Sequence, residues 1–189
     1  HQIKKVFAQI VRSEKFLGIG YDSTKGCESL RRQLARRAVD SGILVSPENI
    51  VITAGCQGAI GLCLRTLCQP GDIVAVETPS YYGLLQLIES LGLKAIEIPS
   101  DSVTGMSIEA LKLALEQWPI KAILSVPSFS NPVGALMPDK NKQQLVELIY
   151  EYNIPLIEDD IYGDLGYSEQ RPKAVKAFDT KGQVLLCSS

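Results

Sequence analysis

The sequence predicts a three-layer α/β/α domain built on a mostly parallel β-sheet. Short segments rich in β-branched residues alternate with longer segments whose apolar residues recur at the period of an α-helix. The short segments are apolar nearly throughout, which is typical of parallel strands that helices cover on both faces. The length of 189 residues, of which 46% are hydrophobic, suits one domain with a sizeable core.

The elements are expected in a regular order. Residues 1–20 should form a linker with a short amphipathic entry helix, followed by the loop "LGIGYDSTKG". Helices are expected at about 26–41, 56–68, 80–91, 107–117 and 138–152. Strands are expected at 49–54, 72–77, 94–99, 121–127, 154–159 and 183–188. Ligands bind to such sheets outside the carboxyl ends of the strands, so the residues that follow each strand are the candidates for a site.

The charge balance argues against a nucleic-acid or membrane partner for this domain. Nineteen Lys and Arg residues oppose 21 Asp and Glu residues, and the net charge is -2. The arginines of "LRRQLARR" are therefore expected on a solvated helix face rather than on DNA. No apolar stretch approaches the ~20 residues of a membrane helix, and we expect a cytoplasmic protein.

The histidine and cysteine content excludes several kinds of site. The only histidine is His1, so a Ser-His-Asp or Cys-His apparatus and a His-ligated metal are disfavoured. The five cysteines form no CxxC pair, which argues against a disulfide framework or a zinc knuckle. Cys56 and Cys63, seven residues apart on one helical face, are expected to be buried as small apolar side chains.

A glycine-rich turn, "GCQGAIG", follows the expected strand at 49–54. Free backbone N–H groups at the start of a helix can hold a phosphate, and Gln57 could add a side-chain donor. The spacing matches neither GxGxxG nor a P-loop, and tight packing at Gly55 is the alternative explanation.

Three further motifs end strands at the same edge. In "ETPSYYGLLQ", Tyr81 or Tyr82 could stack on a planar ligand, or either could simply pack in the core. In "SVPSFSNPVG", the Asn131 amide could meet a ligand oxygen, or form a plain turn. In "IEDDIYGDL", Asp159 ends its strand, whereas Asp160 is expected to be a solvated surface acid. A flat heteroaromatic cation that carries a phosphate would satisfy all four motifs.

In their order along the chain, "TAGCQGA", "PSYYG", "PSFSNPVG" and "EDDIYGD" resemble the large domain of fold-type I, aspartate aminotransferase-like enzymes that depend on pyridoxal 5'-phosphate (PLP). The loop "YDSTKG" resembles the family's Y-x4-G element, and the resemblance covers residues 21–189. It implies that Gly55, Cys56 and Gln57 hold the cofactor phosphate and that Tyr81 stacks on the pyridine ring.

The same resemblance implies roles for the remaining motif residues. Asn131 and Tyr162 would bind the phenolic oxygen of the ring, and Asp159 would pair with the ring nitrogen. A carboxylate there favours the protonated ring, because an opposite charge at close range shifts a pKa by roughly 1 to 3 units. Tyr21 would reach the phosphate bound by the other subunit of a homodimer, and Ser189 would contact the phosphate.

One departure from the family pattern concerns the catalytic lysine. In the family, this lysine follows a Ser-x-Ser element, and the sequence stops at Ser189, which matches the first serine. The arginine that binds the substrate carboxylate lies later still. The resemblance therefore implies a truncated large domain, a fragment that ends before the lysine and does not transaminate alone.

The segments between these motifs look most like the aminotransferase-like C-terminal domains of bacterial GntR-type regulators of the MocR group. That resemblance implies an effector-binding and dimerisation domain that senses PLP or an amino-acid-like ligand and meets DNA only through an upstream domain. The alternative is the catalytic domain of an aminotransferase that acts on an α-amino acid. A third interpretation is a domain that binds another phosphorylated small molecule.

Overall fold

The computed structural model describes residues 2–12 and 23–189, and their core is one six-stranded sheet. The strands are β1 (Ile73–Thr78), β2 (Lys94–Asp101), β3 (Gly105–Met106), β4 (Ile120–Ser125), β5 (Leu156–Asp159) and β6 (Val184–Cys187). Their order is β3-β2-β1-β4-β5-β6, and every neighbouring pair is parallel except β2 and β3. The mostly parallel sheet is thus confirmed.

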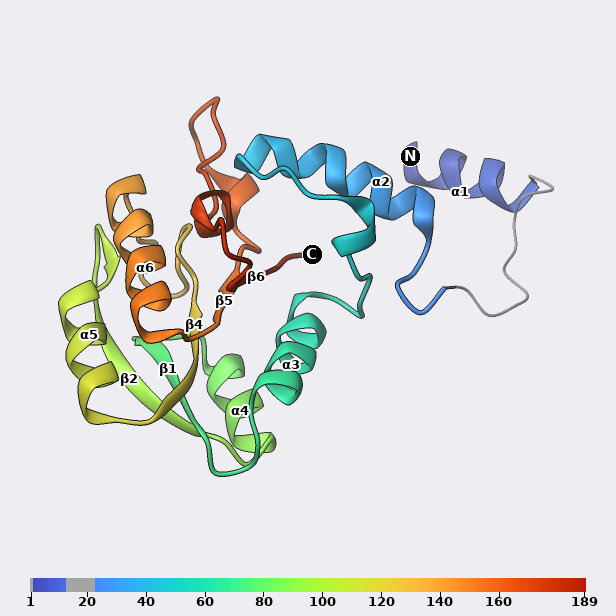
Figure 1. Cartoon of the computed structure of the whole chain (residues 1–189). Helices are drawn as coiled ribbons and strands as arrows, with labels where there is room; N and C mark the ends of the chain where they lie inside the picture. Colours follow the sequence, from blue (N-terminus) through green and yellow to red (C-terminus); the bar gives the residue numbers. More distant parts are fainter. Residues whose placement is uncertain (1, 13–22) are drawn as a thin grey trace.

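Helices cover both faces of the sheet (Figure 1). They are α1 (Gln2–Arg12), α2 (Glu28–Arg37), α3 (Cys56–Leu67), α4 (Tyr82–Ser90), α5 (Ile108–Gln117) and α6 (Asp139–Tyr152). Short 3₁₀ turns lie at Ala38–Ser41, Pro47–Asn49, Gly163–Leu165 and Val175–Phe178.

The side chains of each strand alternate between two apolar clusters. Ala75, Ile123 and Leu156 pack with α5 and α6 on one face. The next residue along, as in Val76 and Leu124, packs with α3 and α4 on the other face. This alternation is the period of two that a strand requires, and it confirms the three-layer architecture.

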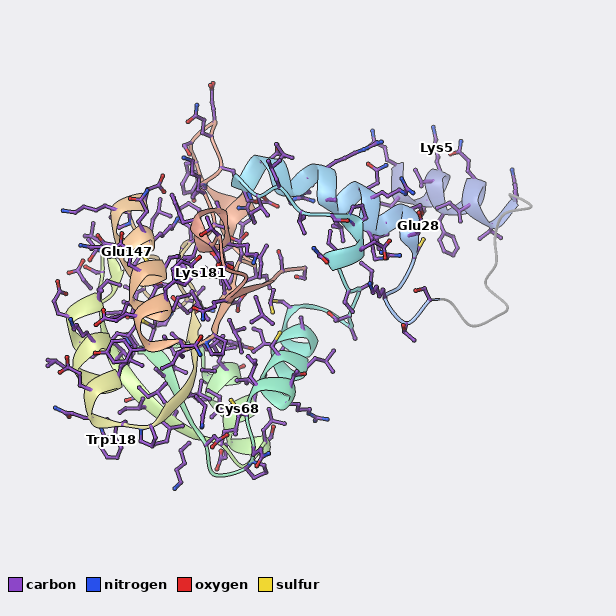
Figure 2. The ribbon with its side chains drawn as sticks, in the orientation of Figure 1. Lys5, Glu28, Cys68, Trp118, Glu147 and Lys181 are labelled. Atoms are coloured by element: carbon purple, nitrogen blue, oxygen red, sulfur yellow. The ribbon has the colours of Figure 1, made fainter. Side chains whose placement is uncertain are left out.

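The helix α1 contributes nothing to these clusters. None of its residues is buried, and it lies apart from the sheet in Figure 1. Figure 2 shows Lys5 projecting from this helix. The expected entry helix is therefore present within residues 2–12.

The expected strand at 49–54 is wrong. Residues 51–53 belong to no strand of the sheet. The Ile52 N–H donates instead to the Lys25 carbonyl oxygen at 3.0 Å. A Cβ on Gly26 would lie 2.6 Å from the Ile52 Cβ, so the close approach of the two segments requires a glycine there, with φ of 83°. β-branched residues favour an extended backbone, but they do not supply a partner strand.

The strand β3 was not expected. A strand of two residues is too short to show an alternating pattern, and β3 pairs with β2. It covers one edge of the sheet with an antiparallel bridge.

Candidate functional site

The residues that were expected to form a site come from the carboxyl ends of β1, β4 and β5 and from the start of α3. Two direct contacts join them. The Cys56 Sγ donates to Asp159 Oδ1 at 3.2 Å, and the Asn131 Nδ2 donates to the Tyr162 hydroxyl at 3.1 Å. The structure therefore brings the glycine-rich turn to the acid and the amide to the tyrosine.

Asp159 is a nearly buried carboxylate, with 8% of its surface exposed. Its Oδ1 accepts hydrogen bonds from Cys56 and from the Ile161 N–H, the latter at 3.2 Å. Burial raises the pKa of Asp159, and the two hydrogen bonds oppose that shift. Among residues 2–12 and 23–189, no lysine or arginine forms an ion pair with Asp159. A ligand cation beside this carboxylate would stabilise its charged form.

The expectation that Asp160 is a solvated surface acid is wrong. Only 2% of Asp160 is exposed, and its Oδ2 lies 2.5 Å from Arg171 Nη2. Arg171 also holds Asp164, whose Oδ1 lies 2.5 Å from Nε. The two adjacent aspartates thus differ in their partners. Asp160 is neutralised by a protein cation, whereas Asp159 keeps Oδ2 free of any protein ion pair in the described part of the chain.

The start of α3 is open toward a ligand. Gly55 is the N-cap residue with φ of 84°, no side chain caps the helix, and a Cβ on Gly55 would meet nothing within 4 Å. The first backbone N–H groups of a helix have no partner within the helix, so an uncapped start favours an anion.

The side chains of this turn have other partners. Gln57 donates its side-chain amide to the Gly83 carbonyl oxygen at 3.1 Å, which ties α3 to α4. The Cys56 side chain is buried and faces Asp159. The backbone, rather than these two side chains, is therefore available for a phosphate.

Tyr81 is the partly buried member of the tyrosine pair. It packs against the apolar cluster that includes Leu84, whereas Tyr82 is 67% exposed. Their ring centroids are 4.8 Å apart. The Tyr81 ring lies over Gly83, since a Cβ at that position would clash with Tyr81 Cε1. Contact with Tyr82 is the main reason that the pKa of Tyr81 is raised, and Tyr162 adds a smaller effect.

Two buried acids near the site carried no sequence signal beyond their place in apolar strands. Glu77, in β1, accepts hydrogen bonds from the Ser125 hydroxyl and, at 2.9 Å, from the Val126 N–H, so it joins the ends of β1 and β4. Glu158 accepts from the Val175 and Lys176 N–H groups at 2.7 and 2.8 Å. An acid inside an otherwise apolar strand is the pattern that could have indicated such a structural role.

The structure does not test the expected roles of Ser189 and Tyr21. Ser189 is exposed at the end of the sequence, next to Ser188, whose hydroxyl donates to the Asp160 carbonyl oxygen at 3.1 Å. Tyr21 lies outside the described residues.

The arginines of α2 were expected on a solvated face, and this is wrong for Arg31. Arg31 is buried, and its Nη1 donates to the Pro47 carbonyl oxygen.

The described residues contain no cluster of His, Cys, Asp or Glu that could bind a metal ion. None of the described helices is both long and apolar enough to span a bilayer.

The fold and the site together define an α/β domain with an acid, an aromatic ring and an open helix start at the carboxyl edge of a parallel sheet. The family model for aminotransferases of class I and II matches residues 3–189. The chain belongs to this family, as the resemblance predicted.

Similar proteins include both regulators and enzymes. The HTH-type transcriptional regulator YjiR of Escherichia coli (strain K12) is 49% identical over 171 residues, which are 90% of this chain and 36% of that protein. Aromatic-amino-acid aminotransferase 1 of Thermococcus litoralis is 32% identical over 191 residues, 97% of this chain and 45% of that protein. The chain thus spans less than half the length of these relatives.

Solved structures show the same fold. An archaeal alanine:glyoxylate aminotransferase superposes with a TM-score of 0.92 at 31% identity, covering 98% of this chain and 47% of that one. LysN, the alpha-aminoadipate aminotransferase of Thermus thermophilus, superposes with a TM-score of 0.89 at 28% identity, covering 98% and 47%. The LysN structure is complexed with N-(5'-phosphopyridoxyl)-L-leucine.

Proposed function

We propose that residues 21–189 are the first portion of a PLP-binding domain, and that this domain serves a bacterial transcriptional regulator as its effector-binding and dimerisation module. Residues 1–20 would be the linker and entry helix, and an upstream domain would bind DNA. The full-length protein would act in the cytoplasm.

One observation carries the cofactor assignment. Asp159 presents a nearly buried carboxylate with one oxygen already bonded by Cys56 and Ile161 and, within the described residues, no protein cation as a partner. Burying a carboxylate without a counter-charge is unfavourable, so a cationic ligand at this position stabilises the folded protein as well as the complex. The protonated pyridine nitrogen of PLP has the required charge.

The rest of the edge fits the remaining parts of PLP. The open start of α3, at Gly55, Cys56 and Gln57, suits the phosphate, and Ser189 would add a hydroxyl. The partly exposed ring of Tyr81 suits stacking on the flat ring of the cofactor. Asn131 and Tyr162, already hydrogen-bonded to each other, would bind the phenolic oxygen. When bound, the cofactor supplies an electron sink for bonds at the α-carbon of an amino acid.

The regulator is favoured over the enzyme by the relatives YjiR and YdcR of Escherichia coli, both HTH-type transcriptional regulators, at 49% and 39% identity. Neither Lys25 nor Lys181 is proposed as a substitute for the catalytic lysine, since neither follows a Ser-x-Ser element. Lys25 Nζ donates to the Glu48 carbonyl oxygen at 2.8 Å, and Lys181 Nζ lies 4.3 Å from the centre of the Tyr150 ring. A homodimer would complete each site through Tyr21 of the other copy.

The catalytic domain of an aminotransferase is the second candidate, and the relative from Thermococcus litoralis favours it. The two candidates differ in what PLP changes. In a regulator, PLP or an amino-acid adduct shifts the affinity of the full-length protein for its DNA. In an enzyme, the full-length protein converts an α-amino acid to the oxo acid at a rate that depends on PLP.

The cofactor assignment is tested by titrating the full-length protein with PLP and recording its visible absorbance and circular dichroism. Asp159→Ala should weaken PLP binding at least tenfold, since a charge-assisted hydrogen bond contributes on the order of 1.5 to 3 kcal/mol. Asp40→Ala, at an exposed acid outside the site, is the matched control and should bind as the wild type does. Equal affinity and an equal spectrum for Asp159→Ala would remove the assignment.

A further inference from the structure

Two cysteine thiols touch near the candidate site. Cys63, on α3, and Cys187, the last residue of β6, have their Sγ atoms 3.8 Å apart. They are 124 residues apart in the sequence, so the contact is created by the packing of α3 against β6. Cys187 is buried, whereas Cys63 is partly exposed, so a small oxidant can reach the pair from one side.

The geometry is close to that of a disulfide. A disulfide requires sulfur atoms about 2.05 Å apart on two backbones that are already near each other. The two sulfurs must therefore approach by only about 2 Å. Because α3 and β6 are already packed together, rotation of the two cysteine side chains can bring the sulfur atoms closer.

The two thiols have different chemical roles. The hydrogen bond from Cys187 lowers the pKa of Cys63 to about 7, although burial opposes the shift. The same bond, followed by burial, raises the pKa of Cys187. The thiolate therefore forms on the more exposed sulfur, and the thiolate is the species that reacts with an oxidant.

We propose that Cys63 and Cys187 are a modification site that forms a reversible disulfide on reaction with a peroxide. The Cys63 thiolate attacks one oxygen of hydrogen peroxide, the O–O bond breaks, and the protein sulfur becomes a sulfenic acid while one water leaves. The Cys187 sulfur then attacks the sulfenic sulfur and releases a second water. Two thiols and one peroxide give one disulfide and two waters, so atoms and electrons balance.

The position of this bond relates it to the candidate site. Cys56, the first residue of α3, donates a hydrogen bond to Asp159. Cys187 lies opposite Asp159 in the pairing of β5 with β6. A disulfide would thus join the helix and the strand that flank Asp159. The inference rests on the thiol contact and does not depend on the proposed function.

The remaining cysteines provide internal controls. Burial raises the pKa of Cys56 strongly, and the nearby Asp159 charge adds to the effect. Burial also raises the pKa of Cys68, the residue that follows the last turn of α3 (Figure 2). Cys27 is exposed and far from the pair in sequence. Neither Cys56 nor Cys68 therefore shares the lowered pKa of Cys63.

The experiment uses the reduced full-length protein, freed of reductant and treated with a few equivalents of hydrogen peroxide. Digestion without reductant followed by mass spectrometry should show the Cys63 peptide joined to the Cys187 peptide, with the loss of two hydrogens. Dithiothreitol should restore both thiols. Cys27→Ser should give the same cross-link in the same yield.

Two variants keep the test decisive. In Cys187→Ser, a hydroxyl can still donate to the Cys63 sulfur but cannot form a disulfide, so the Cys63 sulfenic acid should persist and react with dimedone. Cys63→Ala should abolish both the cross-link and the rapid consumption of peroxide. Over-oxidation of Cys63 in the wild type without the cross-link, or no reaction at Cys63, would overturn the proposal.

Discussion

Replacing Arg171 should destabilise the protein far more than replacing an arginine in a surface ion pair. Arg171 neutralises Asp160, and the two side chains are only 14% and 2% exposed. Arg171→Met leaves the Asp160 carboxylate buried without a counter-charge, and its Oδ1 already has no hydrogen-bond partner. Because breaking a buried pair costs about 3–5 kcal/mol, we expect a loss of about 3 kcal/mol in the free energy of unfolding, at the low end since Arg171 is partly exposed.

The matched control is Arg32→Met. Arg32 pairs with Glu28 one helical turn away, and the two side chains are 64% and 59% exposed. Water screens such a pair, and its loss should cost about 0.5 kcal/mol or less. Urea unfolding followed by far-ultraviolet circular dichroism measures both losses.

The pH dependence identifies the cause. Burial already raises the pKa of Asp160, and Arg171 opposes that shift. Without Arg171 the pKa in the folded protein should rise further above the unfolded value of about 3.9. The folded variant then takes up a proton that the unfolded chain does not, so the deficit should shrink as the pH falls from about 7.5 to about 5.

A second substitution completes the test. Asp160→Asn combined with Arg171→Met removes both charges, and it should recover part of the stability lost in Arg171→Met alone. An equal loss at both pH values, with no recovery in the double variant, would refute the reasoning from the uncompensated charge.

Two further predictions concern Gly83 and Glu158. Gly83→Ala should weaken PLP binding several-fold in absorbance titrations, because the new Cβ displaces the Tyr81 ring and an aromatic contact contributes about 0.5–1.5 kcal/mol. The control is Gly61→Ala, which should bind PLP normally because this helical glycine has room for a Cβ. Burial raises the pKa of Glu158 to about 7, so wild-type stability should fall as the pH rises from about 5 to 7, and Glu158→Gln should reduce that slope in unfolding curves. A slope unchanged in Glu158→Gln would show that another group titrates.

Local patterns were sufficient for most of the architecture. The strands β1, β2, β4, β5 and β6 and the helices α3 to α6 were predicted within a few residues, because continuous apolar runs and helical periodicity depend on neighbours in the sequence. The family was recognisable from four short motifs, since each motif is contiguous. Three of the motifs follow parallel strands and so meet at one edge, whereas the glycine-rich turn starts α3 and reaches that edge through the contact of Cys56 with Asp159.

The errors have a common physical origin. Residues 49–54 have the composition of a strand, but whether a strand pairs depends on a partner that composition does not specify. Asp160 was expected in solvent because the surface is the ordinary place for an acidic side chain. Its counter-ion, Arg171, lies eleven residues later and reaches it only when the chain folds back.

Residue patterns alone therefore determined the layers of the fold, the family, and the acid, aromatic and amide residues at the carboxyl edge, because these features depend on short-range spacing. Only the tertiary structure decided which of two adjacent aspartates is neutralised by the protein. It also decided that Cys56 meets Asp159 and that Cys63 meets Cys187. These two thiol contacts join residues more than a hundred positions apart, and burial and the partners that packing supplies set the charge and reactivity of such groups.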